Sequence, residues 1–482
     1  MDARQVDGYT LMGRAGAAAL AGLRERWPRA RHLRIWCGAG NNAGDGYVIA
    51  RLAAASGLAV SVIAVGPPDR LHGAAARARD DWCAAGGRIR SADDRLDGAD
   101  DAGVDVEVDA LLGTGLDRPL SGDYARAVAR MNDSPAPCLA VDVPTGLHAD
   151  TGAVLGDAVR ADLTVTFIAL KIGLFLGPAR DHVGHLEFAP LVDGPAPAGA
   201  PAPVARRLGA ASLAAWLPPR ARDSHKGRHG RILIVGGGRG MPGAARLAAE
   251  AALRTGAGLV TVATRPEHVA AIVAARPEII CHGIDADRDG LSVLTALADA
   301  ADVVAVGPGL GRDDWAQRVW ARAVAADRPM VLDADALNLL AARPSRSDQR
   351  IVTPHPGEAA RLLECDVSQV QADRPAALAA LLERYGGVAV LKGAGSLVGS
   401  RAILPWVCDE GNPGLASAGT GDVLTGMIAA LRAVISDPLD AAACGVLLHA
   451  RAADLVATDA GERGLLAGDL MPAIRALVNH RC

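Results

Sequence analysis

The chain has 482 residues, of which half are apolar and 22% are charged, as in an ordinary globular protein. At about 150 residues per domain, this length predicts two to four domains. Aromatic residues make up only 3% and the formal net charge is −4, which argues against a nucleic-acid-binding protein. The sequence contains no uncharged apolar run of about 20 residues, so we expect no membrane span.

The eight cysteines are scattered along the chain and form no CxxC pair. This pattern predicts reduced thiols rather than disulfides or a zinc site. The first residues are polar and do not resemble a secretory signal. We therefore expect a cytoplasmic protein.

Both halves of the chain alternate short β-branched runs with alanine-rich helical runs. This alternation predicts mostly parallel sheets with helices on both faces, and so two three-layer α/β/α domains. The segment 193–204, DGPAPAGAPAPV, is typical of a linker and divides the chain into domains 1–205 and 206–482. The predicted strands are 33–37, 59–65, 104–112, 138–143, 163–169, 231–236, 259–264, 303–307, 330–334, 351–354 and 388–393.

The first motif, GAGNNAGDG at residues 38–46, follows a strand and opens a helix. Its match to GxGxxG/A is weak evidence alone, and the acidic residue of a dinucleotide site is missing from the next strand end. The glycines would let an anionic ligand approach the helix N-terminus, while the asparagine amides could bind a cation or a ribose. The alternative is a tight turn with capping residues.

Two further strand ends in the first half carry carboxylates, Asp109 and Asp142. Loops at the carboxyl ends of parallel strands meet in one crevice, so we expect these aspartates to lie near Asn42. Together with the Thr145 hydroxyl, they would suit a hard cation better than zinc. One carboxylate could act as a general base, and the alternative is that each caps a turn.

In the second half, GTGD at residues 419–422 precedes a helical run. A glycine-rich helix start can bind a phosphate, and Asp422 could accept the proton of a substrate hydroxyl, as phosphoryl transfer requires. The alternative is that Asp422 only caps the helix. The sequence contains no GxxxxGK[ST], which excludes a P-loop enzyme.

Two other strand ends in this half are candidates for ligand binding. The segment LKGAGS, which includes residues 392–396, could contact a nucleotide. His355 lies between two prolines, which would position it rigidly, and a structural role is equally plausible. We expect Asp335 and His449 to be structural.

These motifs, in their order, resemble two enzyme families. GAGNNAGDG, DALLGTGL, DVPTGL and the segment 166–173 are similar to the NAD(P)H-hydrate epimerases. SHKG, GAGLVT, GPGLG, DADALN, TPHPGE, LKGAGS and GNPGLASAGTGDVLTG are similar to the ADP-dependent NAD(P)H-hydrate dehydratases. The resemblance implies a Rossmann-like first domain and a ribokinase-like second domain.

The resemblance also implies a substrate and two reactions. NADH or NADPH can add water across C5–C6 of the nicotinamide ring, giving R and S 6-hydroxy epimers. The first domain would interconvert the epimers, and the second would dehydrate the S form with ADP, giving AMP and phosphate. The partners would be these hydrates and ADP, in a homo-oligomer.

For the first domain, the resemblance implies a potassium ion bound by Asn42, Asp109 and Thr145. Because Asp142 is a strand-end carboxylate in the expected crevice, we also interpret it as the catalytic acid or base. The implied hydrate contacts are Asn41, Asn42, Ala43, Gly44, Asp45, Gly113, Thr114, Gly115, Leu116, Asp117, Arg118, Pro119, Tyr124 and Asp142.

For the second domain, we interpret Asp422 as the group that activates the 6-hydroxyl toward the β-phosphate of ADP, with Mg²⁺ accompanying the nucleotide. The implied hydrate contacts are Gly258, Gly309, His355 and Asp422. The implied nucleotide contacts are Lys392, Gly393, Ala394, Gly395, Ser396 and Gly421. The alternative for the whole chain is a ribokinase-like kinase of a vitamin precursor, attached to a non-catalytic binding domain.

Overall fold

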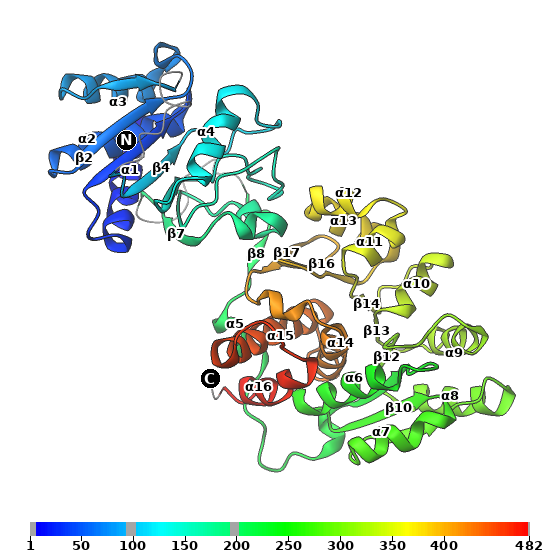
Figure 1. Cartoon of the computed structure of the whole chain (residues 1–482). Helices are drawn as coiled ribbons and strands as arrows, with labels where there is room; N and C mark the ends of the chain where they lie inside the picture. Colours follow the sequence, from blue (N-terminus) through cyan, green and yellow to red (C-terminus); the bar gives the residue numbers. More distant parts are fainter. Residues whose placement is uncertain (1–5, 93–102, 193–201, 481–482) are drawn as a thin grey trace, which may run out of the picture. The chain divides into compact units, whose positions relative to one another are not determined.

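A computed structural model of the chain describes residues 6–92, 103–192 and 202–480 (Figure 1). The chain divides into two compact units, residues 1–202 and 203–482, and each is built on its own sheet. Most of the predicted linker, residues 193–201, lies outside the described residues. The predicted two-domain α/β architecture is confirmed.

The first domain has an all-parallel seven-stranded sheet in the order β3-β2-β1-β4-β5-β6-β7. Its central strands β4, β5 and β6 are buried at every position, although β4 (VEVDA) and β6 (LTVTF) also carry polar residues. From β1 the chain adds β2 and β3 toward one edge of the sheet and then β4 to β7 toward the other, so the strand order reverses between β1 and β4. The strands are β1 (His32–Cys37), β2 (Ala59–Ala64), β3 (Ile89–Ser91), β4 (Val106–Ala110), β5 (Cys138–Val141), β6 (Leu163–Phe167) and β7 (His185–Ala189).

Helices cover both faces of this sheet. The helices α1 (Gly8–Arg26), α2 (Asn41–Ala55) and α3 (Gly73–Ala84) share one apolar cluster with the sheet. The helix α4 (Gly122–Asn132) contributes to a second cluster on the opposite face. The carboxyl edge of the strands is therefore left open for a site.

The second domain has a ten-stranded sheet in the order β11-β10-β9-β12-β13-β14-β15-β16-β17-β8. The first seven strands of this order are parallel, whereas β16 runs antiparallel to both β15 and β17. The edge strand β8 then pairs in parallel with β17. Sequence analysis missed this antiparallel extension. The strands are β8 (Arg206–Arg207), β9 (Arg231–Val235), β10 (Leu259–Thr264), β11 (Ile280–Gly283), β12 (Val303–Val306), β13 (Met330–Leu332), β14 (Arg350–Val352), β15 (Val388–Leu391), β16 (Ser396–Ser400) and β17 (Ile403–Cys408).

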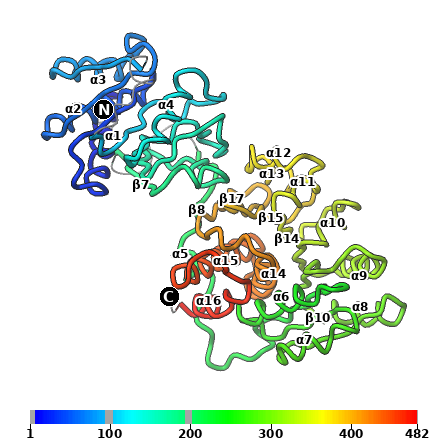
Figure 2. The backbone as a smooth tube through the Cα atoms, viewed as in Figure 1, coloured from blue at the N-terminus to red at the C-terminus, as the bar shows by residue number. Residues whose placement is uncertain are grey.

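Two groups of helices enclose this sheet (Figure 2). One face carries α5 (Ala210–Trp216), α6 (Pro242–Thr255), α7 (Val269–Ala275), α14 (Thr420–Arg432), α15 (Pro438–Ala460) and α16 (Leu470–Leu477). The other carries α8 (Arg288–Ala300), α9 (Asp314–Val324), α10 (Asp335–Ala342), α11 (Pro356–Leu363), α12 (Val367–Ala372) and α13 (Arg374–Tyr385). Among the described residues, only α15 is long and apolar enough to span a membrane, and most of it is buried in this domain.

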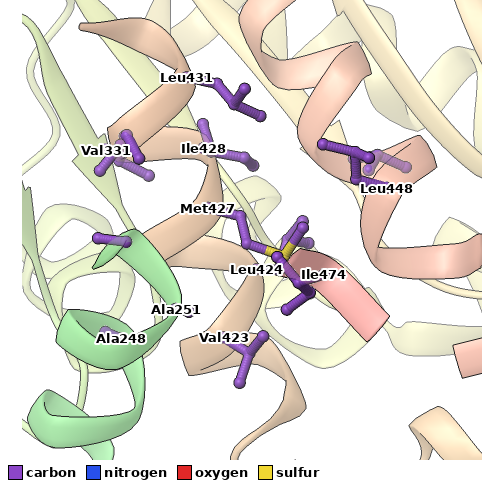
Figure 3. Close-up of a cluster of buried hydrophobic side chains, with 14 of the residues drawn as sticks. Ala248, Ala251, Val331, Val423, Leu424, Met427, Ile428, Leu431, Leu448 and Ile474 are labelled. Atoms are coloured by element: carbon purple, nitrogen blue, oxygen red, sulfur yellow. The ribbon is translucent and has the colours of Figure 1, made fainter. Parts of the chain in front are cut away.

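The helix α14 is the centre of the larger apolar core. Figure 3 shows its side chains between α6 and the two C-terminal helices α15 and α16. Gly426 makes this packing possible, because a Cβ there would lie only 1.9 Å from the Ala248 carbonyl oxygen of α6. Since the N-terminus of α14 carries the GTGD motif, this close helix contact also fixes the position of that motif.

Replacing Gly426 with alanine should therefore lower the free energy of unfolding by about 1–3 kcal/mol, because backbone must move to admit the methyl group. The exposed Gly243→Ala, in α6, is the matched control, because a Cβ there meets nothing within 4 Å. Denaturant unfolding of both variants measures the difference. Equal stabilities would contradict the close packing of α6 and α14.

Candidate functional site

The first site lies at the carboxyl edge of the first sheet, where the strand order reverses. Open α/β sheets bind ligands at such switch points. A cavity of about 370 Å³ is found there, formed by the turn after β1, the loop after β4 and the end of β5. Its lining residues are Gly40, Asn41, Asn42, Asp45, Leu111, Leu112, Gly113, Thr114, Gly115, Leu116 and Asp142.

Glycines bring the turn after β1 against the neighbouring strand. A Cβ on Gly38 would lie 2.0 Å from the Leu111 carbonyl oxygen, and one on Gly46 would lie 2.7 Å from Ala110 Cβ. Only glycine fits such contacts, so α2 starts directly beside β4. The free N–H groups of its first turn are thereby available to an anionic ligand.

Asp109 is fully buried behind the cavity and is held by Thr145. Its Oδ1 accepts a hydrogen bond from the Thr145 hydroxyl and its Oδ2 accepts one from the Thr145 N–H, both at 2.7 Å. Burial raises the pKa of Asp109 to about 6, although these bonds lower it. The pair therefore ties the loop that follows β5 to the end of β4.

Asn42 is nine-tenths buried, and its amide nitrogen has no hydrogen-bond partner among the described residues. Because the two ends of an amide are assigned rather than observed, this atom could equally be the oxygen. Asn42, Asp109 and Thr145 thus offer amide, carboxylate and hydroxyl oxygens, which are the donors of a hard cation. The residues present fit a potassium ion.

Asp142 ends β5 in a strained turn and is paired with Lys171. Its φ is +69°, which is uncommon for a residue other than glycine. Its Oδ1 accepts hydrogen bonds from the Lys171 ammonium, the Thr166 hydroxyl at 3.1 Å and the Phe167 N–H at 3.2 Å. Lys171 also donates to the Phe167 carbonyl at 2.9 Å. Sequence analysis gave Lys171 no role, although it is the cation nearest to Asp142.

Several predicted contacts of the first domain lie outside this lining. Ala43 and Gly44 are buried in α2, where a Cβ on Gly44 would meet the Met12 side chain. These two positions therefore pack α2 in place. The other predicted contacts outside the lining are Asp117, Arg118, Pro119 and Tyr124.

The second site lies at the carboxyl edge of the second sheet and is organised by Asp333. This carboxylate, 1% exposed, follows β13. Its Oδ1 accepts hydrogen bonds from Lys392 at 2.7 Å and from Thr353 at 2.8 Å, and its Oδ2 accepts one from Thr425 at 2.8 Å. The loops after β13, β14 and β15 and the helix α14 are thereby joined at one point.

Lys392 and Asp422 lie beside this carboxylate. Burial alone would lower the pKa of Lys392, but Asp333 and Glu358 raise it, so the ammonium stays charged. A Cβ on Gly421 would lie 3.4 Å from Lys392 Nζ, which places the ammonium at the N-terminus of α14. Burial and then Asp333 raise the pKa of Asp422 to about 7, with Lys392 opposing them. A group with this pKa can exchange protons at neutral pH.

The turn of residues 392–396 is held from behind by Arg374. This fully buried guanidinium donates to the carbonyl oxygens of Leu391 and Lys392, both at 3.2 Å, and of Gly395 at 3.4 Å. Burial lowers the pKa of Arg374 to about 10. Ser396 closes the turn by donating to the Gly393 carbonyl. Sequence analysis missed Arg374, because an arginine at a helix start gives no signal of its partners.

His355 caps α11 at the same edge of the sheet. Its ring Nδ1 accepts a hydrogen bond from the Gly357 backbone N–H at 3.0 Å, and the backbone N–H of His355 donates to the Glu358 carboxylate at 2.8 Å. Burial lowers the pKa of His355. The ring is half exposed, so it remains accessible to a ligand.

Gly258 is not brought to this site. It precedes β10, and its N–H donates to the carbonyl oxygens of His229 and Gly230 at the amino edge of the sheet. A Cβ there would lie 1.9 Å from the Lys226 carbonyl oxygen, so the glycine serves packing. By contrast, Gly309 follows β12 at the carboxyl edge and lies against Met241 and Ala244.

Asp335 and His449, the two residues expected to be structural, lie close to the second site. Asp335 accepts a hydrogen bond from the Gly311 N–H at 2.8 Å. His449 is buried in α15, and burial lowers its pKa to about 4. After burial and Asp333, the charge of Asp335 also contributes to the raised pKa of Asp422.

Removing the Asp333 carboxylate should destabilise the domain strongly. Asp333→Ala would leave Lys392 buried without its main partner, which costs about 3–5 kcal/mol of unfolding free energy. Thr425→Val is the matched control, because it removes one hydrogen bond to the same carboxylate, worth about 1.5–3 kcal/mol, and leaves the ion pair in place. Denaturant unfolding measures both variants. If Asp333→Ala cost no more than Thr425→Val, the ion pair would not organise this edge.

Two family models match the chain. A model described as YjeF-related protein N-terminus matches residues 8–173. A model described as NAD(P)H-hydrate dehydratase matches residues 232–476. Each match thus falls within one of the two domains.

Proteins named bifunctional NAD(P)H-hydrate repair enzymes are similar along nearly the whole chain. The Escherichia coli (strain K12) protein is 46% identical over 471 residues, which cover 98% of this chain and 90% of that protein. The Coxiella burnetii protein is 47% identical, with coverages of 98% and 95%. The solved structure of the ADP/ATP-dependent NAD(P)H-hydrate dehydratase from Bacillus subtilis, co-crystallised with ATP/Mg²⁺, is 33% identical with a TM-score of 0.52. That match covers 58% of this chain and 99% of that one.

Proposed function

The chain belongs to the family of bifunctional NAD(P)H-hydrate repair enzymes, and from that premise we propose how its residues divide the work. The enzyme converts hydrated NADH and NADPH back into the normal cofactors. Its first domain interconverts the R and S hydrates, and its second domain dehydrates the S hydrate with ADP. The observation that carries the second assignment is Asp422, a buried carboxyl with a pKa of about 7 beside Lys392 and the start of α14.

In the first domain, the cavity between β1 and β4 would hold the hydrate. The N-terminus of α2 would bind an anionic group of the substrate. Asp142 would contact the reacting end, because it lines the cavity and is oriented by its ion pair with Lys171. A carboxylate at that point can accept a proton, so we assign Asp142 as the catalytic base.

A potassium ion would be held by Asn42, Asp109 and Thr145. Their amide, carboxylate and hydroxyl oxygens are the support for this assignment, together with the unpartnered buried amide of Asn42. When bound, the ion would supply positive charge beside the cavity. It would thereby favour anionic parts of the substrate.

In the second domain, residues 392–396 and the N-terminus of α14 would bind the ADP phosphates. Asp422 would accept the proton of the 6-hydroxyl while that oxygen attacks the β-phosphorus, and AMP would leave. Phosphate would then depart from C6 with its bonding electrons, while C5 loses a proton and the C5–C6 double bond forms. The Lys392 charge would stabilise the phosphoryl group in transfer.

Mg²⁺ would accompany the nucleotide. Among the described residues, no group of three or more His, Cys, Asp or Glu side chains is arranged to hold a metal ion. Magnesium commonly binds through substrate phosphates and only one or two carboxylates. The second site, with Glu358 and Asp422 near Lys392, suits that mode of magnesium binding.

We also propose that the enzyme is cytoplasmic. The seven free cysteines of the described chain support this localisation.

Single substitutions should separate the two activities in the full chain. Given mixed hydrates and ADP, the parent restores dihydronicotinamide absorbance completely. Asp142→Asn should slow epimerisation by about 10²–10⁴-fold. The fast phase of absorbance recovery should then end once the S hydrate has been consumed. Asparagine tolerates the positive φ at this position, so the fold should survive.

Asp422→Asn is the reciprocal variant. It should stop dehydration while chromatography still detects interconversion of the epimers. AMP and free phosphate should form only with the parent and Asp142→Asn. Formation of a stable phosphorylated product instead would favour a kinase.

The dehydratase should depend on pH through Asp422. A base acts only when ionised, and burial raises the pKa of Asp422 to about 7. The kcat/KM of dehydration should therefore increase between about pH 6 and 8 and level off above. Circular dichroism of the same preparation at each pH is the control, because it shows that the protein stays folded over this interval. A dehydratase profile that is flat over this interval would contradict the role of Asp422 as base.

A further inference from the structure

The first site contains a second carboxyl, Asp45, whose interactions differ from those of Asp142. Asp45 lies in the early part of α2 and lines the same cavity. Within the described part of the chain, its carboxyl takes part in no hydrogen bond or ion pair. A mostly buried polar group that lacks a protein partner and borders a cavity is placed to bind a ligand.

The charged groups around Asp45 favour its protonated form. Burial comes first, and the negative charge of Asp142 acts in the same direction, so the pKa of Asp45 is raised well above its ordinary value. Lys171 lowers this pKa, but its ammonium is already paired with Asp142. One cavity thus holds two carboxyl groups in different surroundings, one with a raised pKa and no protein partner and one paired with a lysine. Different surroundings of two carboxyl groups are how acid and base roles are set in enzyme sites.

Epimerisation of the hydrate requires an acid as well as a base. C6 carries a hydroxyl and is bonded to N1, so its configuration can invert if the C6–O bond breaks and re-forms on the other face. Hydroxide is a poor leaving group, whereas water leaves easily once a proton is supplied. General acid help of this kind is worth about 10²–10⁴-fold in rate.

We propose that Asp45 is a further catalytic residue of the first domain and protonates the 6-hydroxyl of the hydrate. The C6–O bond then breaks with its electron pair going to oxygen, which leaves as water. The N1 lone pair forms an N1=C6 bond, so the ring becomes a cation beside the Asp45 and Asp142 carboxylates. Water adds to C6 from the opposite face, the N1=C6 pair returns to N1, and the added water gives its proton to the Asp142 carboxylate. Exchange with solvent then removes this proton from Asp142 and returns one to Asp45. This proposal rests on the proposed epimerase function of the domain.

The experiment compares the full-length parent with Asp45→Asn, an isosteric variant that has no acidic proton. We expect kcat for interconversion to decrease by about 10²–10⁴-fold, while KM and the dehydratase activity stay nearly unchanged. The parental rate should decline at high pH as Asp45 ionises, and the variant should lack that decline. Asp133→Asn, an exposed aspartate at the end of α4, is the matched control and should behave as the parent.

Two further measurements keep the proposal testable. Asp45→Asn should unfold at about the same temperature as the parent, because the asparagine amide has nearly the same size and shape as the protonated carboxyl and is likewise uncharged. Independently of any variant, the parent in H₂¹⁸O should place one ¹⁸O at C6 for each inversion, after subtraction of the reaction without enzyme. Retention of ¹⁶O, or an Asp45→Asn variant that is folded and as fast as the parent, would overturn the proposal.

These experiments also distinguish failure of the epimerase function from failure of the role proposed for Asp45. If the parent itself did not interconvert the epimers, the epimerase function of the first domain would be refuted. If the parent interconverts them and only the Asp45 outcomes fail, the function stands and the acid lies elsewhere.

Discussion

Both sites depend on a carboxylate that is buried behind the end of a central strand and satisfied by hydroxyl or ammonium groups. Asp109 is bound by Thr145 from the neighbouring strand end, and Asp333 is bound by Lys392, Thr353 and Thr425. A parallel sheet covered by helices has mostly apolar faces, so a ligand site forms most readily where the strands end. Each buried carboxylate then costs stability unless the surrounding loops supply its partners. Those loops are thereby fixed, and they carry the functional groups.

Backbone strain accompanies the same strand ends. Asp142, Ile168 and Ala334 all have positive φ, between 50° and 69°, although none is glycine. For Asp142 and Ile168, a hydrogen bond joins the two flanking residues across each turn. Such γ-turns are rare and strained, and strained residues persist only where the surroundings enforce them. Here the surroundings are the bonds from the Phe167 N–H and Lys171 to Asp142, which link the two turns.

The sequence was sufficient for the strands of the parallel sheets and for the motifs at their ends. Apolar runs and glycine turns are local signals, so the positions of Asn42, Asp109 and Asp142 could be predicted, and the topology of a parallel sheet brought them together. Lys171 and Arg374 were missed because their roles depend on partners that lie in other loops. Gly258 was misplaced for a related reason. A glycine needed for close packing and a glycine needed for ligand access look the same in sequence. At Gly258 the Lys226 carbonyl oxygen lies so close that no side chain would fit, which shows the packing role.

The two unrelated sites share one electrostatic arrangement. In the first, Lys171 is paired with Asp142 while Asp45 lies near both. In the second, Lys392 is paired with Asp333 while Asp422 lies near both. In each site one carboxylate takes the lysine as its partner, and the pKa of the second carboxyl is raised, first by burial and then by the charge of the paired aspartate. A raised pKa suits the second carboxyl to proton transfer. In both proposed reactions a proton moves to or from the 6-hydroxyl oxygen of the hydrate, which gives a physical reason for a similar arrangement of charges at both strand edges.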